Sequence, residues 1–173
     1  MYYLFYFILK NIFIILFIKK MIHCILLVNR QGKVRLMKWY DCFIINERPR
    51  YIKEMSIMVI GRGSKMTNVI EWKQYKIIYK RYASLYFICL SDKEDNELIV
   101  LELINHFVEC LDSYFGNVCE LDIIFNFQKS YYIIEEILCG GLIQETDRNE
   151  IQKLLSIQDM RLKEEIEEDY APK

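Results

Sequence analysis

The sequence contains few of the residues from which disordered chains, disulfide scaffolds and zinc sites are built. Its 173 residues include two prolines, six glycines and two histidines. The six cysteines form no CxxC pair, and neither histidine lies at ligand spacing from a cysteine. We therefore expect a folded chain without a metal site, and cysteines within apolar runs are typical of a reducing compartment.

Hydrophobic and charged residues make up most of the sequence. They make up 53% and 27% of the chain, which is typical of a packed protein, and the length fits one domain. The net charge is −1, but residues 1 to 90 hold 16 basic and 4 acidic residues, whereas residues 91 to 173 hold 7 and 20. Either the basic half faces an acidic partner or membrane, or basic and acidic elements lie side by side in one domain.

The first twenty residues, MYYLFYFILKNIFIILFIKK, differ from the remainder. As a helix, the stretch from Tyr2 to Ile18 would be about 26 Å long, marginal for a bilayer, and the central Lys10 would cost roughly 2.5 to 3.5 kcal/mol. The stretch has neither the basic start nor the small-residue cleavage site of a signal peptide. We interpret residues 1 to 20 as an extension outside the functional domain, such as a gene-model artefact, with a membrane anchor as the alternative.

Two segments have the pattern of β-strands. An apolar run from Ile22 to Val28, a turn at residues 29 to 32 and an alternating segment at residues 33 to 40 indicate a β-hairpin. Residues 68 to 91 alternate between apolar and polar and are rich in tyrosine, phenylalanine and isoleucine. This pattern predicts two or three antiparallel strands with a tight turn near residues 81 to 84.

Four other segments have helical periodicity or helix-capping residues. Strands and helices that follow one another without βαβ repeats predict an α+β fold with an antiparallel sheet. Helices are expected from Asn46 as N-cap to about Ile60, from Asp95 or Asn96 to Phe115, from Glu120 to Leu138 with a glycine stop at Gly140 and Gly141, and from about Thr146 to Glu168.

Several of these segments together resemble one family. They are MIHCILLVNRQGKVRLMKWY, EWKQYKIIYKRYASLYF, DNELIVLELINHFVECLDSYFGNVCELDIIFNF and the pair of glycines at 140 and 141. The chain resembles the small (sigma) chain of heterotetrameric clathrin adaptor complexes from Met21 to about residue 160. The variants DNELI, LELI and VCELDIIFNF, with a tail past residue 160, are most similar to the small chain of adaptor protein complex 1.

This resemblance implies a fold and a set of partners. The fold is expected to be longin-like, a five-stranded antiparallel sheet packed with helices plus a C-terminal helix. It would occupy residues 21 to 160, followed by an acidic tail at 161 to 173. The implied partners are a large gamma-type chain, beta-type and medium chains, cargo tails with [DE]xxxL[LI] signals, and clathrin indirectly. Nucleic acid, cofactors and catalysis are not expected.

The resemblance also implies a location and a role. Family members are cytoplasmic and lie peripherally on the trans-Golgi network, endosomes and clathrin-coated vesicles. The small chain is expected to stabilise the core of its complex and, with the large chain, to recognise acidic dileucine signals for transport between these membranes.

The residues that the resemblance assigns to this role form two sets. Arg35 matches the residue that helps to hold the acidic side chain of the signal, which we name the acidic-residue site. The positions that match the family's leucine pocket, which we name the leucine site, are Ala83, Leu85, Val108, Asn117, Val118 and Ile123. From composition alone, Ala83, Leu85, Val108 and Ile123 would be ordinary core residues, Asn117 a turn residue and Arg35 a solvated strand residue.

Other interpretations stay open at this point. A membrane-anchored longin-type protein of vesicle fusion or tethering would require a true N-terminal anchor, and a small hydrolase would require a nucleophile and base that do not stand out here. Basic strand residues could contact anionic lipid or form a solvated face. They are Lys33, Lys38, Lys76, Lys80 and Arg81.

Overall fold

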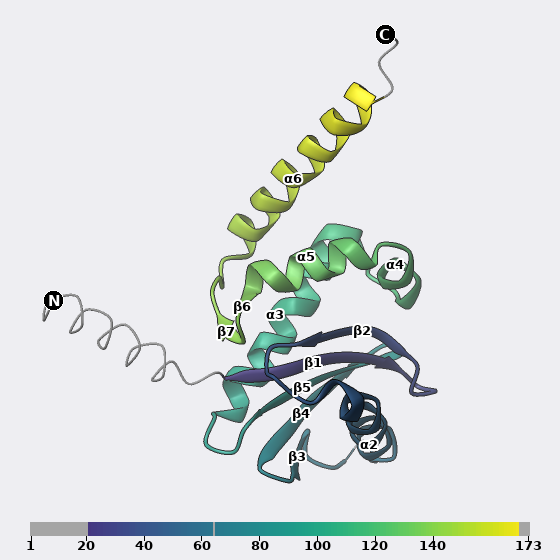
Figure 1. Ribbon diagram of the computed structural model, residues 1–173, viewed down its shortest axis with the longest axis vertical. Helices are drawn as coiled ribbons and strands as arrows, with labels where there is room; N and C mark the ends of the chain where they lie inside the picture. Colours follow the sequence, from purple (N-terminus) through teal and green to yellow (C-terminus); the bar gives the residue numbers. More distant parts are fainter. Residues whose placement is uncertain (1–20, 64, 170–173) are drawn as a thin grey trace, which may run out of the picture.

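A five-stranded antiparallel sheet forms the centre of the molecule (Figure 1), in the order β2-β1-β5-β4-β3. The structure is a computed structural model that describes residues 21 to 63 and 65 to 169. The elements are β1 (Ile22–Asn29), β2 (Val34–Trp39), the 3-10 helix η1 (Ile45–Glu47), α2 (Arg48–Ile60), β3 (Val69–Trp72), β4 (Tyr75–Tyr82), β5 (Leu85–Asp92), α3 (Glu97–Phe115), α4 (Glu120–Phe125), α5 (Phe127–Ile137), β6 (Leu138–Cys139), β7 (Leu142–Ile143) and α6 (Arg148–Asp169).

The two most apolar strands lie inside the sheet. All eight residues of β1 and the first seven of β5 are buried, because helices cover both faces at this point. Alternate side chains of β1 therefore enter different cores: Ile25 and Leu27 pack in the core beneath α3, whereas Leu26 and Val28 pack against α2. This two-sided burial explains why β1 is a continuous apolar run rather than an alternating one.

Helix α2 covers one face of the sheet, and α3 and α5 cover the other (Figure 1). The Asn96 side chain caps α3 by accepting a hydrogen bond of 3.0 Å from the Leu98 N–H. Helix α6 packs against α3 and α5 through its first turns, where Ile151 and Leu155 are buried. The Asp159 carboxylate fastens α6 further by accepting hydrogen bonds from Tyr114 of α3 and Lys129 of α5.

The predicted α+β class, the antiparallel sheet and the C-terminal helix are confirmed, and the fold is longin-like. Two local predictions are wrong. Asn46 lies within η1 rather than capping α2, whose N-cap is Glu47. The helix predicted from residue 120 to 138 breaks at Asn126, and it ends in a strand, so Gly140 and Gly141 form the β6–β7 turn instead of stopping a helix.

Ion pairs join the basic half of the chain to the acidic half. Lys76 of β4 pairs with Glu97 of α3, and Lys38 of β2 pairs with Glu135 of α5. These contacts support the interpretation that basic and acidic elements lie side by side in one domain.

The basic strand residues differ in their contacts. Lys80 binds Asn105 of α3, and Lys38 and Lys76 are engaged in the ion pairs above, so these three residues do not form a simple solvated face. Contact of the basic residues with anionic lipid stays a hypothesis. Lys33 and Arg81 remain exposed.

The predicted limits of the domain stay predictions. Residues 1 to 20, interpreted above as an extension, lie outside the part that the structure describes. Helix α6 continues past residue 160 to Asp169. Among the helices of residues 21 to 63 and 65 to 169, none is both long and apolar enough to cross a membrane.

The six cysteines are free and divide into two groups, which predicts a selective reaction with iodoacetamide. Burial raises the pKa of Cys24 and Cys89, and it raises the pKa of Cys110 to about 11, so these thiols are both covered and protonated. We expect the native protein to be alkylated only at the exposed residues Cys42, Cys119 and Cys139, as measured by peptide mass spectrometry. A urea-unfolded sample is the control and should be labelled at all six; rapid labelling of Cys89 in the native sample would contradict the packing.

Candidate functional site

Arg35, the predicted acidic-residue site, lies on β2 and is already paired with a carboxylate of the same chain. Its Nε and Nη2 are each 2.7 Å from Oε1 of Glu120, the first residue of α4. Both side chains are 22% exposed. Arg35 is therefore a half-buried member of an ion pair, and the expectation from composition of a solvated strand residue is wrong.

Two further donors complete the surroundings of Glu120. Asn29, at the end of β1, donates from Nδ2 to Oε1 over 3.2 Å, and Ser84, in the β4–β5 turn, donates from Oγ to Oε2 over 3.2 Å. Asn29 is itself held in place because its Oδ1 accepts the backbone N–H groups of Gln31 and Lys33 in the β1–β2 turn. One carboxylate thus joins three separate parts of the sheet to α4.

These interactions determine the charge state of Glu120. Burial alone would raise the pKa of its carboxyl, but the hydrogen bonds from Arg35 and Asn29 and the charge of Arg35 lower the pKa by more. Glu120 is therefore ionised at neutral pH. Because its folded-state pKa lies below the ordinary value, the contribution of this network to stability is present at neutral pH and is lost as the pH falls through the lowered pKa.

The apolar members of the leucine site come together in one hydrophobic cluster. Leu85 lies at the start of β5, Val108 on α3, Val118 in the α3–α4 loop and Ile123 on α4. Ile123 is 0% exposed and Leu85 is 5% exposed, whereas Val108 and Val118 are half-buried. In this conformation Leu85 and Ile123 are covered by the chain's own side chains, and of these four residues only the two valines are partly accessible.

The other two members lie at turns beside this cluster. Ala83 and Asn117 are exposed, and both have positive φ angles, 51° and 61°. Ala83 precedes Ser84, which binds Glu120, so the leucine site and the acidic-residue site adjoin at the β4–β5 turn. The structure brings the predicted residues to one end of the sheet, but their role in binding stays a prediction.

Local hydrogen bonds hold the start of α4 in position. The Asp112 side chain of α3 accepts the N–H of Val118 over 2.9 Å, and Asp122 accepts the N–H of Cys119 over 2.8 Å. Cys119 and Asp122 form a capping box, and the hydrogen bond from Cys119 lowers the pKa of Asp122. Helix α4 is thus capped without help from Glu120, which leaves that side chain free to face β2.

Sequence reasoning did not identify Glu120, Asn29 or Ser84 as parts of this site. Glu120 lies 85 residues from Arg35 and 91 from Asn29, so no local spacing links them. The available signal was weak: an acidic residue beside the predicted leucine-site residues Asn117 and Val118.

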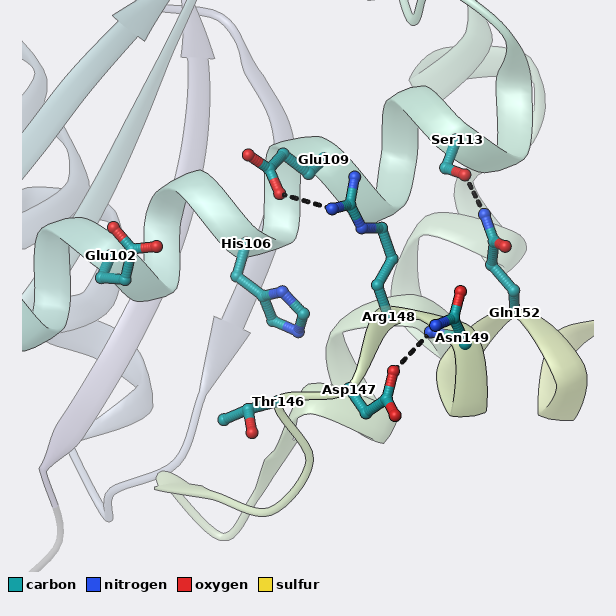
Figure 2. Close-up of a pocket in the computed structure, with 9 residues that line it drawn as sticks. All are labelled: Glu102, His106, Glu109, Ser113, Thr146, Asp147, Arg148, Asn149 and Gln152. Carbon is teal, nitrogen blue, oxygen red and sulfur yellow. Dashed lines mark hydrogen bonds and ion pairs between the residues drawn. The ribbon is translucent and has the colours of Figure 1, made fainter.

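A separate polar hollow of about 660 Å³ lies between α3 and the first turn of α6 (Figure 2). Its walls are joined by an ion pair of 3.5 Å between Glu109 and Arg148 and by a hydrogen bond from Gln152 to Ser113. His106 faces the hollow from α3. The polar stripe of α3 therefore helps to seat α6. Within the described residues, no three histidine, cysteine or acidic side chains group in a way that could hold a metal ion.

The family model described as clathrin adaptor complex small chain matches residues 21 to 161. The chain belongs to this family. Members are subunits of adaptor complexes that act in vesicle transport rather than in catalysis.

Individual relatives show which adaptor-complex subunits the chain is similar to. The chain is 57% identical over 140 residues to the AP-1 complex subunit sigma-2 of Dictyostelium discoideum, covering 81% of this chain and 91% of the relative. It is 50% identical over 153 residues to the human AP-1 complex subunit sigma-1A, covering 88% and 94%. A chain in a homology model of the full-length AP-3 complex in a stretched open conformation has a TM-score of 0.65 and 30% identity, with 88% of this chain and 100% of that chain covered. These relatives support a small subunit of a heterotetrameric adaptor complex, part of a membrane coat.

Proposed function

We propose that this chain, together with a large gamma-type chain, binds acidic dileucine signals in the cytoplasmic tails of cargo proteins. The observation that carries the proposal is the position of the Arg35 guanidinium, which binds Glu120 at the start of α4, two residues after the half-buried Val118 of the leucine site. A cation beside an apolar surface is what a peptide with one acidic residue and two leucines requires. We place this activity in coated-vesicle transport between the trans-Golgi network and endosomes, as in complex 1.

The binding free energy expected from these contacts is that of a weak, reversible interaction. Two fully buried leucine side chains would contribute roughly 1.5 to 3 kcal/mol each, much of which is offset by ordering a flexible tail. An ion pair to Arg35 adds at most about 1 kcal/mol and mainly sets register and specificity. Many such weak contacts on one coat act together.

The burial of Ile123 places a condition on this proposal. Because Ile123 and Leu85 are packed in the core, a ligand leucine reaches them only if α4 or its side chains move. Helix α4 has six residues, and its outward side chains Leu121 and Phe125 are exposed, so its displacement would disturb mainly the packing of Ile123 and the hydrogen bonds of Glu120. We therefore expect the leucine site to open when the ligand binds.

Affinity purification of the native chain tests the proposed function. We expect to recover large gamma-type and beta-type chains and a medium chain with it, and the complex should bind a peptide with an ExxxLL signal. The same peptide with both leucines replaced by alanine is the control, because it retains the acidic residue. A chain recovered without adaptin partners would overturn the proposed assembly.

The alternative of a membrane-anchored longin-type protein gains no support from the described residues. None of their helices qualifies as a membrane span. The segment that could provide an anchor, residues 1 to 20, lies outside the described part.

A further inference from the structure

We propose that Glu120 is an internal competitor for the acidic residue of the ligand, so that it sets how strongly binding depends on that residue. This inference rests on the proposed function, because it assigns a role to a residue at the same site. It predicts that the negative charge of Glu120 weakens the very contact through which Arg35 would select an acidic signal.

The geometry of the ion pair supports competition. Arg35 uses the edge formed by Nε and Nη2, and both atoms lie 2.7 Å from Oε1 of Glu120. This edge is one of the two through which a guanidinium can present a pair of N–H groups to a carboxylate. A ligand carboxylate must therefore displace Glu120 or bind the remaining edge beside a like charge, and either event reduces its net contribution.

The surroundings of Glu120 form a site built for a carboxylate. Arg35, Asn29 and Ser84 come from β2, the end of β1 and the β4–β5 turn, and each donates to one of the two carboxylate oxygens. The same three donors would serve a carboxylate of the ligand equally well. Displacing Glu120 therefore exchanges one carboxylate for another and leaves no donor unpaired.

Release of Glu120 would not unfold the helix that carries it. Asp122, rather than Glu120, closes the capping box with Cys119, and the Val118 N–H is bound by Asp112. Glu120 is the first residue of α4 and makes its hydrogen bonds outward to the sheet. The side chain is thus able to leave Arg35 while α4 keeps its caps.

The test compares two peptides on the assembled adaptor complex that contains this chain. One peptide carries ExxxLL and the other QxxxLL, and fluorescence anisotropy measures both affinities. The ratio of the ExxxLL affinity to the QxxxLL affinity reports how much the acidic residue contributes, separately from the leucines. In the Glu120→Gln variant we expect the ratio to rise by about three- to tenfold over the unmodified complex, since one competing charge at Arg35 is removed.

The matched control is Glu135→Gln. Glu135 of α5 pairs with Lys38 on the same strand as Arg35, so this variant removes an equal charge from an equivalent β2 ion pair. Its peptide ratio should equal that of the unmodified complex. Thermal unfolding of both variants checks that each complex stays assembled.

Each outcome decides the question. A rise in Glu120→Gln alone supports competition. An unchanged or lower ratio in Glu120→Gln overturns it, because Glu120 would then be neutral or would orient Arg35 for the ligand. An equal rise in both variants also overturns it, since the effect would be one of general charge. If assembled complexes of all three kinds bind neither peptide, the proposed function fails, and this inference fails with it.

Discussion

Replacing Gly141 by alanine is expected to destabilise the protein by about 3 kcal/mol or more, the largest effect on stability that we predict. A Cβ atom at this position would lie 2.3 Å from the carbonyl oxygen of Ile22, and the φ angle of +90° is unfavourable for any L side chain. The hairpin cannot simply move away, because the Ile22 N–H donates a hydrogen bond of 2.9 Å to the Gly141 carbonyl. The clash therefore acts on the first residue of β1.

Urea or thermal unfolding of the chain measures this effect, and Gly140→Ala is its matched control. Gly140 also has a positive φ, +60°, but a Cβ there would meet nothing within 4 Å. Only the cost of the left-handed conformation remains, about 1 to 2 kcal/mol. Equal destabilisation by the two variants would mean that conformational strain, and not the contact with Ile22, makes Gly141 necessary.

Replacing Val108 by aspartate is expected to abolish binding of a dileucine peptide, which corresponds to a loss of affinity of about a hundredfold or more. Val108 is half-buried on α3 and packs against the cluster that contains Leu85 and Ile123. A carboxylate at this position would have to be desolvated by the incoming leucines, and the cation of the adjoining acidic-residue site, Arg35, is already paired with Glu120. Assembly of the complex should be unaffected, as judged by co-purification of the large chains.

Ser113→Asp serves as the matched control for Val108→Asp. It adds the same charge to the same helix, but on the exposed polar stripe beside α6 (Figure 2). It should leave peptide binding unchanged. Val118→Asp repeats the test from the α3–α4 loop, where helix packing is not disturbed. Unchanged peptide affinity in both Val108→Asp and Val118→Asp would rule out the leucine site.

Local sequence patterns specified most individual elements of this fold. The apolar run of β1, the turn before Lys33 and the capping residue Asn96 were each sufficient, because an apolar run, a tight turn and an N-cap can be recognised from neighbouring residues. At the predicted glycine stop, a distant contact had overridden local preference. Gly140 and Gly141 would suit a helix stop, but the hydrogen bond to Ile22 holds them in a hairpin turn.

The candidate site was accessible to prediction only in part. Arg35 and the leucine-site residues were identified through the family resemblance, since by composition Leu85 and Ile123 are indistinguishable from core. Their assembly depends on β1 lying between β2 and β5, a pairing of strands about sixty residues apart that no periodicity encodes.

Composition and spacing were enough to specify an α+β chain with an antiparallel sheet, because hydrophobic periodicity and capping act within a few residues. The occupation of Arg35 by Glu120 was decided by tertiary structure, since hydrogen bonds between residues 85 positions apart exist only once α4 is seated against β2. The charge that faces a ligand at this site is therefore a property of the folded arrangement and not of any one segment.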